Sequence, residues 1–304
     1  FITCTSTAKQ RPEGGWLWKI SGNGLSHPSY LFGTYHGTYD ILYQYTDSIP
    51  ELHQAFNACS QFAGESETTS KPTPAQVGAA IKLPKDTTYA DLLNKEDFHF
   101  LDSIVRQSLK SPLNKVYIKP NFLALILGEI EKGKKLVDTG YSQSQIDSMK
   151  SQVMDIALEK KAKEKGLTIV GLEGIFDAFV SEKSNLKKEA DELISDLRED
   201  DEISPLSFVN TLSDVYRTQN MKSLIDFEVK VDSIFRTSPK LTEIGKRIRE
   251  DLLKRRNLNW MNKIPELMKA QPTFIAVGVR HLPGKDGLIA LLLEKGYQVE
   301  PIGL

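Results

Sequence analysis

Two apolar runs near opposite ends of the chain finish in the same way, with the pattern Gly-x-x-His. The first is residues 29–36 (SYLFGTYH) and the second is residues 273–281 (TFIAVGVRH). Each run predicts a buried strand whose glycine lets the backbone turn and whose histidine follows at the carboxyl end. In open α/β sheets that edge binds ligands, because side chains from several strand ends meet there. We therefore expect His36 and His281 to share one site.

The composition is that of a soluble globular protein and excludes several classes of function. The 304 residues suffice for one large domain or two small ones, and 39 basic residues nearly balance 40 acidic ones. This balance leaves no electrostatic footprint for nucleic acid. No apolar run approaches the ~20 residues that span a bilayer. The only cysteines, Cys4 and Cys59, exclude a disulfide framework and form no Cys-x-x-Cys pair.

The N-terminus allows two interpretations. The chain begins with Phe1, which predicts a trimmed end, and residues 1–4 (FITC) precede a polar stretch. This segment matches the remnant of a lipoprotein signal with Cys4 as the lipid-bearing residue, or a disordered leader with an incidental cysteine. The first alternative predicts an exported protein, periplasmic or on the outer surface and anchored through Cys4. In both cases residues 1–15 are a flexible leader and residues 16–304 form the folded domain.

The order of predicted elements indicates an α/β fold. Apolar runs predict strands at residues 16–20, 29–34, 61–67, 167–173, 273–277 and 297–301. Between residues 71 and 165, apolar spacings of three and four predict helices, punctuated by prolines. We therefore expect one domain with a central mixed β-sheet, flanking helices and a large helical insertion at residues 71–165.

A carboxylate completes a candidate metal site. Glu65 ends the third predicted strand, and Glu67 lies two residues on, on the same side if the strand continues. Two imidazoles and one carboxylate are a typical ligand set for a catalytic divalent metal. The alternative is that Glu65 and Glu67 are edge charges that keep the strand soluble.

Two further groups could assist hydrolysis at such a metal. Glu67 or Glu173 could accept the proton of the attacking water. Arg256 could clamp a carboxylate or an oxyanion, although the sequence alone favours a simpler role as a cation near a helix C-terminus. The chain contains no Gly-x-Ser-x-Gly motif, which argues against a serine hydrolase of that type.

The same motifs resemble the TraB/GumN family, which includes the TIKI-type metalloproteases and is related more distantly to ChaN-like proteins and erythromycin esterases. The resemblance rests on residues 29–36, 277–288 and 296–299, on the Gly-Leu-Glu element at 171–173 and on the Arg-Asn element at 256–257. It implies a single α/β domain with a site at His36, Glu65 and His281. In TIKI proteins these motifs are associated with Mn- or Co-dependent peptide cleavage. Two elements depart from the family pattern: Ala178 replaces a glutamine, and residues 153–155 (VMD) replace Gly-Met-Asp.

We therefore predict a metal-dependent hydrolase, a peptidase, with Mn or Co preferred over Zn. His36, Glu65 and His281 are the expected metal ligands. One alternative is a non-catalytic protein that binds a peptide or a small ligand with the same cluster. Another is a metal-free, esterase-like hydrolase in which His36 activates water directly.

Overall fold

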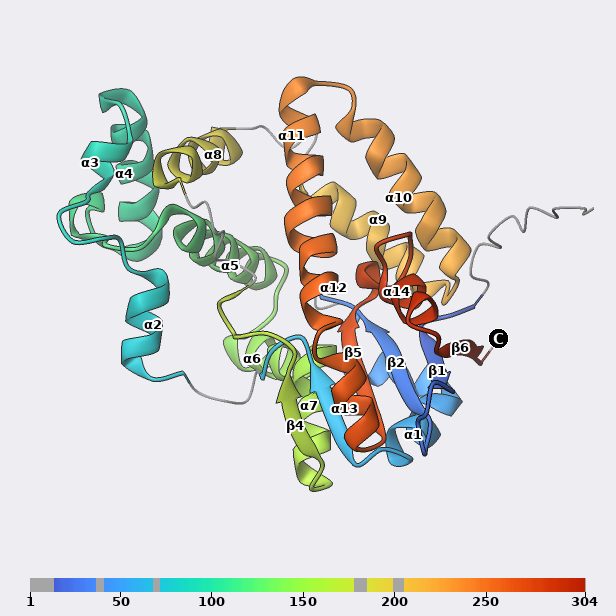
Figure 1. The fold of residues 1–304 in the computed structure, drawn as a ribbon. Helices are drawn as coiled ribbons and strands as arrows, with labels where there is room; N and C mark the ends of the chain where they lie inside the picture. The colour runs from blue at the N-terminus through green and yellow to red at the C-terminus, as the bar shows by residue number, and fades with distance from the viewer. Residues whose placement is uncertain (1–13, 37–40, 68–71, 178–184, 199–204, 304) are drawn as a thin grey trace, which may run out of the picture. The chain divides into compact units, whose positions relative to one another are not determined.

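The computed structural model describes residues 14–36, 41–67, 72–177, 185–198 and 205–303. Cys4 and Ala178, singled out above, lie outside these ranges. The chain divides into two compact units. Figure 1 shows the ribbon coloured by residue number from the N-terminus to the C-terminus. The sheet unit comprises residues 1–69, 152–173 and 206–304, and the helical unit comprises residues 70–151 and 174–205.

A six-stranded mixed sheet forms the centre of the sheet unit and confirms the predicted α/β class. Its strands, in the order β4-β3-β5-β2-β1-β6, are β1 (Leu17–Ser21), β2 (Ser29–Thr34), β3 (Gln61–Gly64), β4 (Thr168–Gly171), β5 (Thr273–Gly278) and β6 (Gln298–Ile302). The neighbours β2, β5, β3 and β4 run parallel, whereas β1 runs antiparallel to both β2 and β6. All four parallel strands therefore end at the same edge of the sheet.

The helices of the sheet unit come from three stretches of the chain. They are η1 (Tyr43–Ser48), α1 (Pro50–Asn57), α7 (Met154–Glu164), α9 (Pro205–Arg217), α10 (Met221–Phe235), α11 (Pro239–Arg247), the π-helix η5 (Ile248–Lys254), α12 (Arg255–Trp260), α13 (Ile264–Ala270), η6 (Val279–His281) and α14 (Leu288–Glu294). Helix α7 packs against β3 and β4, and α14 packs against β6. Within the described ranges, no helix has the length and apolar character needed to cross a membrane.

The helical unit has a core of its own. Its elements are α2 (Pro74–Ile81), α3 (Tyr89–Leu92), α4 (Lys95–Leu109), η2 (Leu113–Lys115), α5 (Pro120–Asp138), α6 (Gln143–Ser151) and α8 (Leu186–Arg198). Leu101, Val105 and Leu123 are completely buried and belong to a cluster that is separate from the core around the sheet. The unit therefore differs in extent from the predicted insertion at 71–165, since it includes α8 and omits α7.

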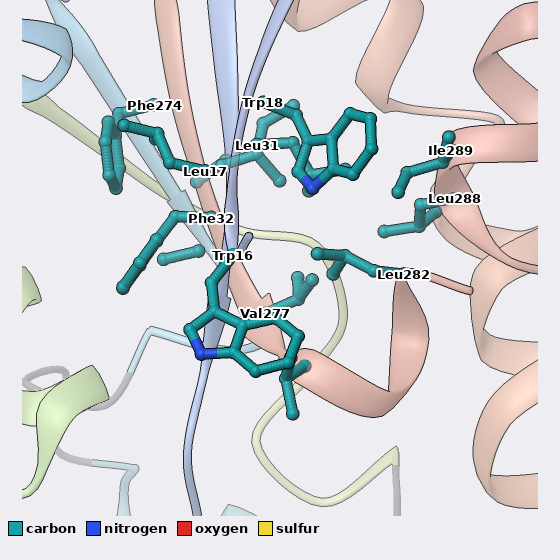
Figure 2. Packing of buried hydrophobic residues seen from close by; sticks show 14 of the residues in the cluster. Trp16, Leu17, Trp18, Leu31, Phe32, Phe274, Val277, Leu282, Leu288 and Ile289 are labelled. Atoms are coloured by element: carbon teal, nitrogen blue, oxygen red, sulfur yellow. The ribbon is translucent and has the colours of Figure 1, made fainter. Parts of the chain in front are cut away.

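Strands β2 and β5 are buried on both faces, which explains why most of their residues are apolar. In Figure 2, Phe32 and Phe274 lie on one side of the strands, and Leu282 and Leu288 lie on the other. All four residues are fully buried. Because both faces are covered by apolar side chains, the parallel pair lacks the alternation of a half-exposed strand.

Gly33 lets the two parallel strands and the turn after β5 pack closely. A Cβ atom at this position would lie 2.9 Å from the Cγ2 atom of Val279 and 3.1 Å from its Cα atom. Gly33 does not have a positive φ, so the expectation that its glycine serves a backbone turn is wrong. The position requires glycine because there is no space for a side chain.

We expect Gly33→Ala to destabilise the sheet unit by about 1–3 kcal/mol, because the added methyl group overpacks a rigid contact. The matched control is Gly128→Ala in α5, where a Cβ would meet no atom within 4 Å. That change should stabilise the helical unit by about 0.5–1 kcal/mol, since it removes a helical glycine. Calorimetric unfolding measures both effects, and an unchanged transition in Gly33→Ala would contradict the packing argument.

Candidate functional site

The carboxyl ends of the four parallel strands bring together the predicted site residues. His36 follows β2 by two residues, Glu65 follows β3 directly, and His281 closes the η6 turn after β5. Glu173 follows β4 by two residues, and its N–H donates to the Glu65 carbonyl across 2.8 Å. The cluster therefore arises from the parallel register, in which Thr34 lies opposite Gly278.

The glycine of the second Gly-x-x-His motif makes room for the histidine of the first. A Cβ at Gly278 would lie 2.9 Å from the Cδ2 atom of His36 and 3.2 Å from the Oε1 atom of Glu65. Gly278, like Gly33, does not have a positive φ. Gly33 in turn makes room for Val279 of the second motif. Each glycine thus clears space for the other motif, which explains why the two motifs recur together.

The two imidazoles both lie near one oxygen of Glu65. The Nε2 atom of His36 is 3.2 Å from Oε1, and the Nε2 atom of His281 is 3.8 Å from the same oxygen. Oε1 also accepts the backbone N–H of Gly278 across 2.7 Å. The other carboxylate oxygen, Oε2, accepts from Arg256 Nη2 across 2.5 Å. Glu65 therefore contacts both histidines, Arg256 and the backbone of Gly278.

The site opens to solvent at His36. The side chain of His36 is 46% exposed, whereas those of His281 and Arg256 are 5% and 10% exposed. Glu65 and Glu173 are also largely buried. Of these side chains, His36 is therefore the one most open to solvent.

Asp155, at the start of α7, contacts the far side of the His36 ring. Its Oδ2 atom lies 3.1 Å from His36 Nδ1, and its Oδ1 atom accepts the hydroxyl hydrogen of Thr34 across 2.6 Å. Sequence reasoning did not place Asp155 in the site. The signal was present in residues 153–155, which stand where the resembling family has Gly-Met-Asp.

The carboxylates around His36 and Glu65 change the pKa values of these groups. Burial alone would lower the pKa of His36, but Asp155 and Glu65 outweigh it and raise the pKa to about 9. Burial would raise the pKa of Glu65, but His36, His281 and Arg256 hold it well below its usual range. For Asp155 burial dominates and raises the pKa, against the attraction of His36.

His281 has a different environment. Burial lowers its pKa to about 3; the attraction of Glu65 opposes this shift, and the positive charge of Arg256 adds to it. Its Nδ1 atom lies 2.7 Å from Asn257 Oδ1, and its Nε2 atom lies 3.2 Å from Arg256 Nη1. The ring also packs against Trp260, with 4.5 Å between ring centroids. His281 is therefore neutral, in contrast to His36.

Helix α12 places Arg256 between the carboxylates. Arg256 Nε donates to both oxygens of Glu173, at 2.9 Å and 3.2 Å, and Nη2 bridges Glu173 and Glu65. Trp260 Nε1 donates to the same Glu173 across 3.1 Å. The π-helix η5 directly precedes α12, and π-helical turns frequently occur at functional sites. Arg256 is therefore the counter-ion of the largely buried carboxylates of Glu65 and Glu173.

Two neighbouring residues point elsewhere. Glu67 lies 3.9 Å from Lys163 and does not join the cluster, because β3 ends at Gly64 and the alternation of its side chains ends with it. Arg280 forms a bidentate pair with Glu228 of α10 at 2.6 Å and 2.9 Å. This pair fastens the turn that carries His281.

The donor atoms suit a divalent metal, with one adjustment. Two imidazole nitrogens and a carboxylate oxygen form a ligand set of the right chemistry. The Nδ1 atom of each ring lies beside a second group, Asp155 for His36 and Asn257 for His281. As the side chains lie, however, the described residues contain no cluster of three or more His, Cys, Asp and Glu arranged to hold a metal ion. The Nε2 atom of His281 is closer to Arg256 than to Glu65. Metal binding would require His281 to exchange this hydrogen bond.

Comparison with known proteins gives two matches and one negative result. The sequence model of the TraB/PrgY/gumN family matches residues 16–301. The metalloprotease TIKI2 of Danio rerio is 22% identical over 332 aligned positions, which cover 98% of this chain and 62% of that relative. The chain therefore spans less than two thirds of the length of TIKI2. No solved structure matches the chain.

We expect Arg256→Leu to lower the free energy of unfolding by about 3–5 kcal/mol, because it leaves buried carboxylates without their counter-ion. The control is Lys254→Leu, which breaks a pair with Glu250 whose side chains are 37% and 53% exposed. That loss should stay below about 1 kcal/mol. Urea unfolding measures both effects.

Adding Glu173→Leu to Arg256→Leu should recover part of the lost stability, because one unpaired carboxylate is then removed. A double variant in which the two losses simply add would contradict the ion pair seen here.

Proposed function

This chain belongs to the TraB/PrgY/gumN family, and from that premise we propose that it is a metal-dependent hydrolase that cleaves peptide bonds. The observation that carries the proposal is the convergence of both Gly-x-x-His motifs on Glu65, with ring nitrogens 3.2 Å and 3.8 Å from one oxygen. The similarity to a metalloprotease supports the same reaction class. His36, Glu65 and His281 would hold the ion.

The charge of the cluster favours a divalent cation. The cluster contains three carboxylates: those of Glu65 and Glu173 pair with Arg256, and that of Asp155 lies beside His36. With the three carboxylates ionised and His36 protonated, one negative charge remains uncompensated, and a divalent ion that displaces the His36 proton would leave the cluster neutral. Buried charge of this kind is costly unless it is paired, and a divalent ion would neutralise it.

A bound metal would supply a Lewis acid and lower the pKa of its water. The protein's own side chains would position the metal ligands. The charge of Asp155, beside Nδ1, would keep His36 in place, and Arg256 binds Oε2 of Glu65, which leaves Oε1 toward the imidazoles. The partly exposed His36 leaves this side of the site accessible to a peptide.

The roles foreseen for the remaining residues stay predictions. Glu173 or Glu67 was expected to accept a proton from water, and Arg256 to stabilise an oxyanion. The contacts favour another use of Glu173 and Arg256, since each is engaged with the other and with Trp260 or Glu65. Export and lipid anchoring through Cys4 also stay predictions, as does the preference for Mn or Co.

One observation weakens the metal-free alternative. A base must be neutral to accept a proton from water, whereas Asp155 and Glu65 raise the pKa of His36 to about 9. Without a metal, the imidazole at the open side of the site would therefore be cationic at neutral pH.

We expect the protein to bind about one Mn²⁺ or Co²⁺ ion per chain, through ligands of the kind found in three-residue catalytic sites. The ratio should fall to background in His36→Ala and His281→Ala, while His53→Ala, which removes an exposed histidine beside Asp47, should bind normally. The measurement is mass spectrometry of metal content after incubation with Mn²⁺, Co²⁺ or Zn²⁺ and removal of free ion. Wild-type protein without metal would refute the proposal.

We expect Asp155→Asn to weaken metal binding about 10–100-fold, because a neutral amide holds His36 less firmly than a carboxylate does. The matched control is Asp47→Asn, which alters a second Asp–His contact, 3.3 Å from His53 on the surface. Competition with a chromophoric chelator gives both dissociation constants. Equal constants for wild type and Asp155→Asn would exclude an orienting role for Asp155.

A further inference from the structure

Asn257 is buried in α12 and makes three polar contacts around the turn that carries His281. Its Nδ2 atom lies 3.2 Å from the carbonyl oxygen of His281 and 2.8 Å from that of Asp286. Its Oδ1 atom lies 2.7 Å from His281 Nδ1. One side chain therefore contacts both the backbone and the ring of the same histidine.

These contacts fix the orientation of the amide. A carbonyl oxygen only accepts hydrogen bonds, so the atom that faces two carbonyls must be the NH₂ group of Asn257. The amide oxygen then faces His281 Nδ1, and because it too only accepts, Nδ1 must carry the hydrogen.

The other ring nitrogen of His281 is fixed by the same reasoning. Nε2 lies 3.2 Å from Arg256 Nη1, and a guanidinium only donates. Nε2 must therefore present a lone pair. The neutral ring has its hydrogen on Nδ1 and its lone pair on the side of Glu65, 3.8 Å away.

We propose that Asn257 is a positioning residue that fixes His281 as the Nδ1–H tautomer and so reserves Nε2 for the centre of the site. The tautomer follows from the contacts alone. The use of Nε2 as a metal ligand rests on the proposed function, which requires this nitrogen to be unprotonated.

The group that accepts from His281 Nδ1 is an amide and not a carboxylate, and this difference matters for the protonation state of the ring. Asp155, an acid, lies beside Nδ1 of His36, whereas a neutral amide accepts from Nδ1 of His281. A neutral acceptor orients the ring without favouring its protonation. Asn257 also braces residues 281–286 through its NH₂ group, so the experiment must separate bracing from control of the tautomer.

Two substitutions at the same position make that separation. Asn257→Ala removes the acceptor and both donors, so nothing holds the Nδ1 side of the ring. His281 can then turn away from Arg256 Nη1, move its hydrogen to Nε2 and donate it to Glu65. Asn257→Asp keeps an acceptor for Nδ1–H but loses the two N–H donors to the carbonyls. Asn259→Ala, an exposed asparagine in the same helix, is the control.

The readout is the ¹⁵N spectrum of histidine-labelled, metal-free protein in alkaline buffer, where the imidazole is neutral. Protonated and unprotonated ring nitrogens resonate in separate ranges, and His281→Gln identifies the His281 signals. We expect the Nδ1–H form in wild type, Asn259→Ala and Asn257→Asp, and the Nε2–H form in Asn257→Ala. An Nε2–H ring in wild type, or an unchanged ring in Asn257→Ala, would overturn the proposal. If Asn257→Ala does not fold, loss of the Nδ1–H form in Asn257→Asp overturns it.

Metal affinity then tests the link to the proposed function. We expect Asn257→Ala to bind Mn²⁺ about 10–100-fold more weakly than Asn259→Ala, as for other groups that orient a ligating histidine. Equal affinities would overturn the use of Nε2 as a ligand. Failure of wild type to bind any metal would refute the proposed function but leave the tautomer assignment intact.

Discussion

The parallel pairing of β2 with β5 is the constraint on which the rest of the site depends. The two strands come from opposite ends of the chain, and their register places Thr34 beside Gly278. A slip of one residue would turn every buried side chain to the other face of the sheet. It would also separate His36 from Gly278, whose missing side chain leaves the space that the imidazole occupies. The fold and the site are therefore specified by the same contact.

Buried charge imposes the second constraint. Glu65 and Glu173 are largely shielded from solvent, and Arg256 pairs with both of them through a single guanidinium. Replacing such a pair with apolar groups is often neutral for stability, so its presence is weak evidence for a stabilising role. Its value here is geometric: Arg256 binds one oxygen of Glu65 and leaves the other for the two histidines.

The sequence predicted the sheet and the convergence of strand ends, because both depend on local patterns. Apolar runs identified the strands, and parallel strands share an edge wherever they occur. The groups that orient the two imidazoles could not be found in this way. Asp155 lies in the first turn of a helix far from His36 in sequence, and Asn257 contacts His281 only because α12 lies against the turn that follows β5. The sequence pattern identified Gly33 and Gly278, but we expected them to allow a backbone turn, whereas the structure shows that they leave space for neighbouring side chains. Both needs select glycine, so the sequence alone does not distinguish them.

Two copies of one local motif thus produce two chemically different histidines. Each Gly-x-x-His places an imidazole near the same carboxylate, that of Glu65. The residue next to Nδ1 of each ring helps to set the protonation state of that imidazole. The carboxylate beside His36 favours the cation, whereas the amide beside His281 holds a neutral ring with a defined lone pair. A repeat in sequence therefore predicts a shared location and not a shared role. The roles are set by α7 and α12, the two helices that contribute Asp155 and Asn257.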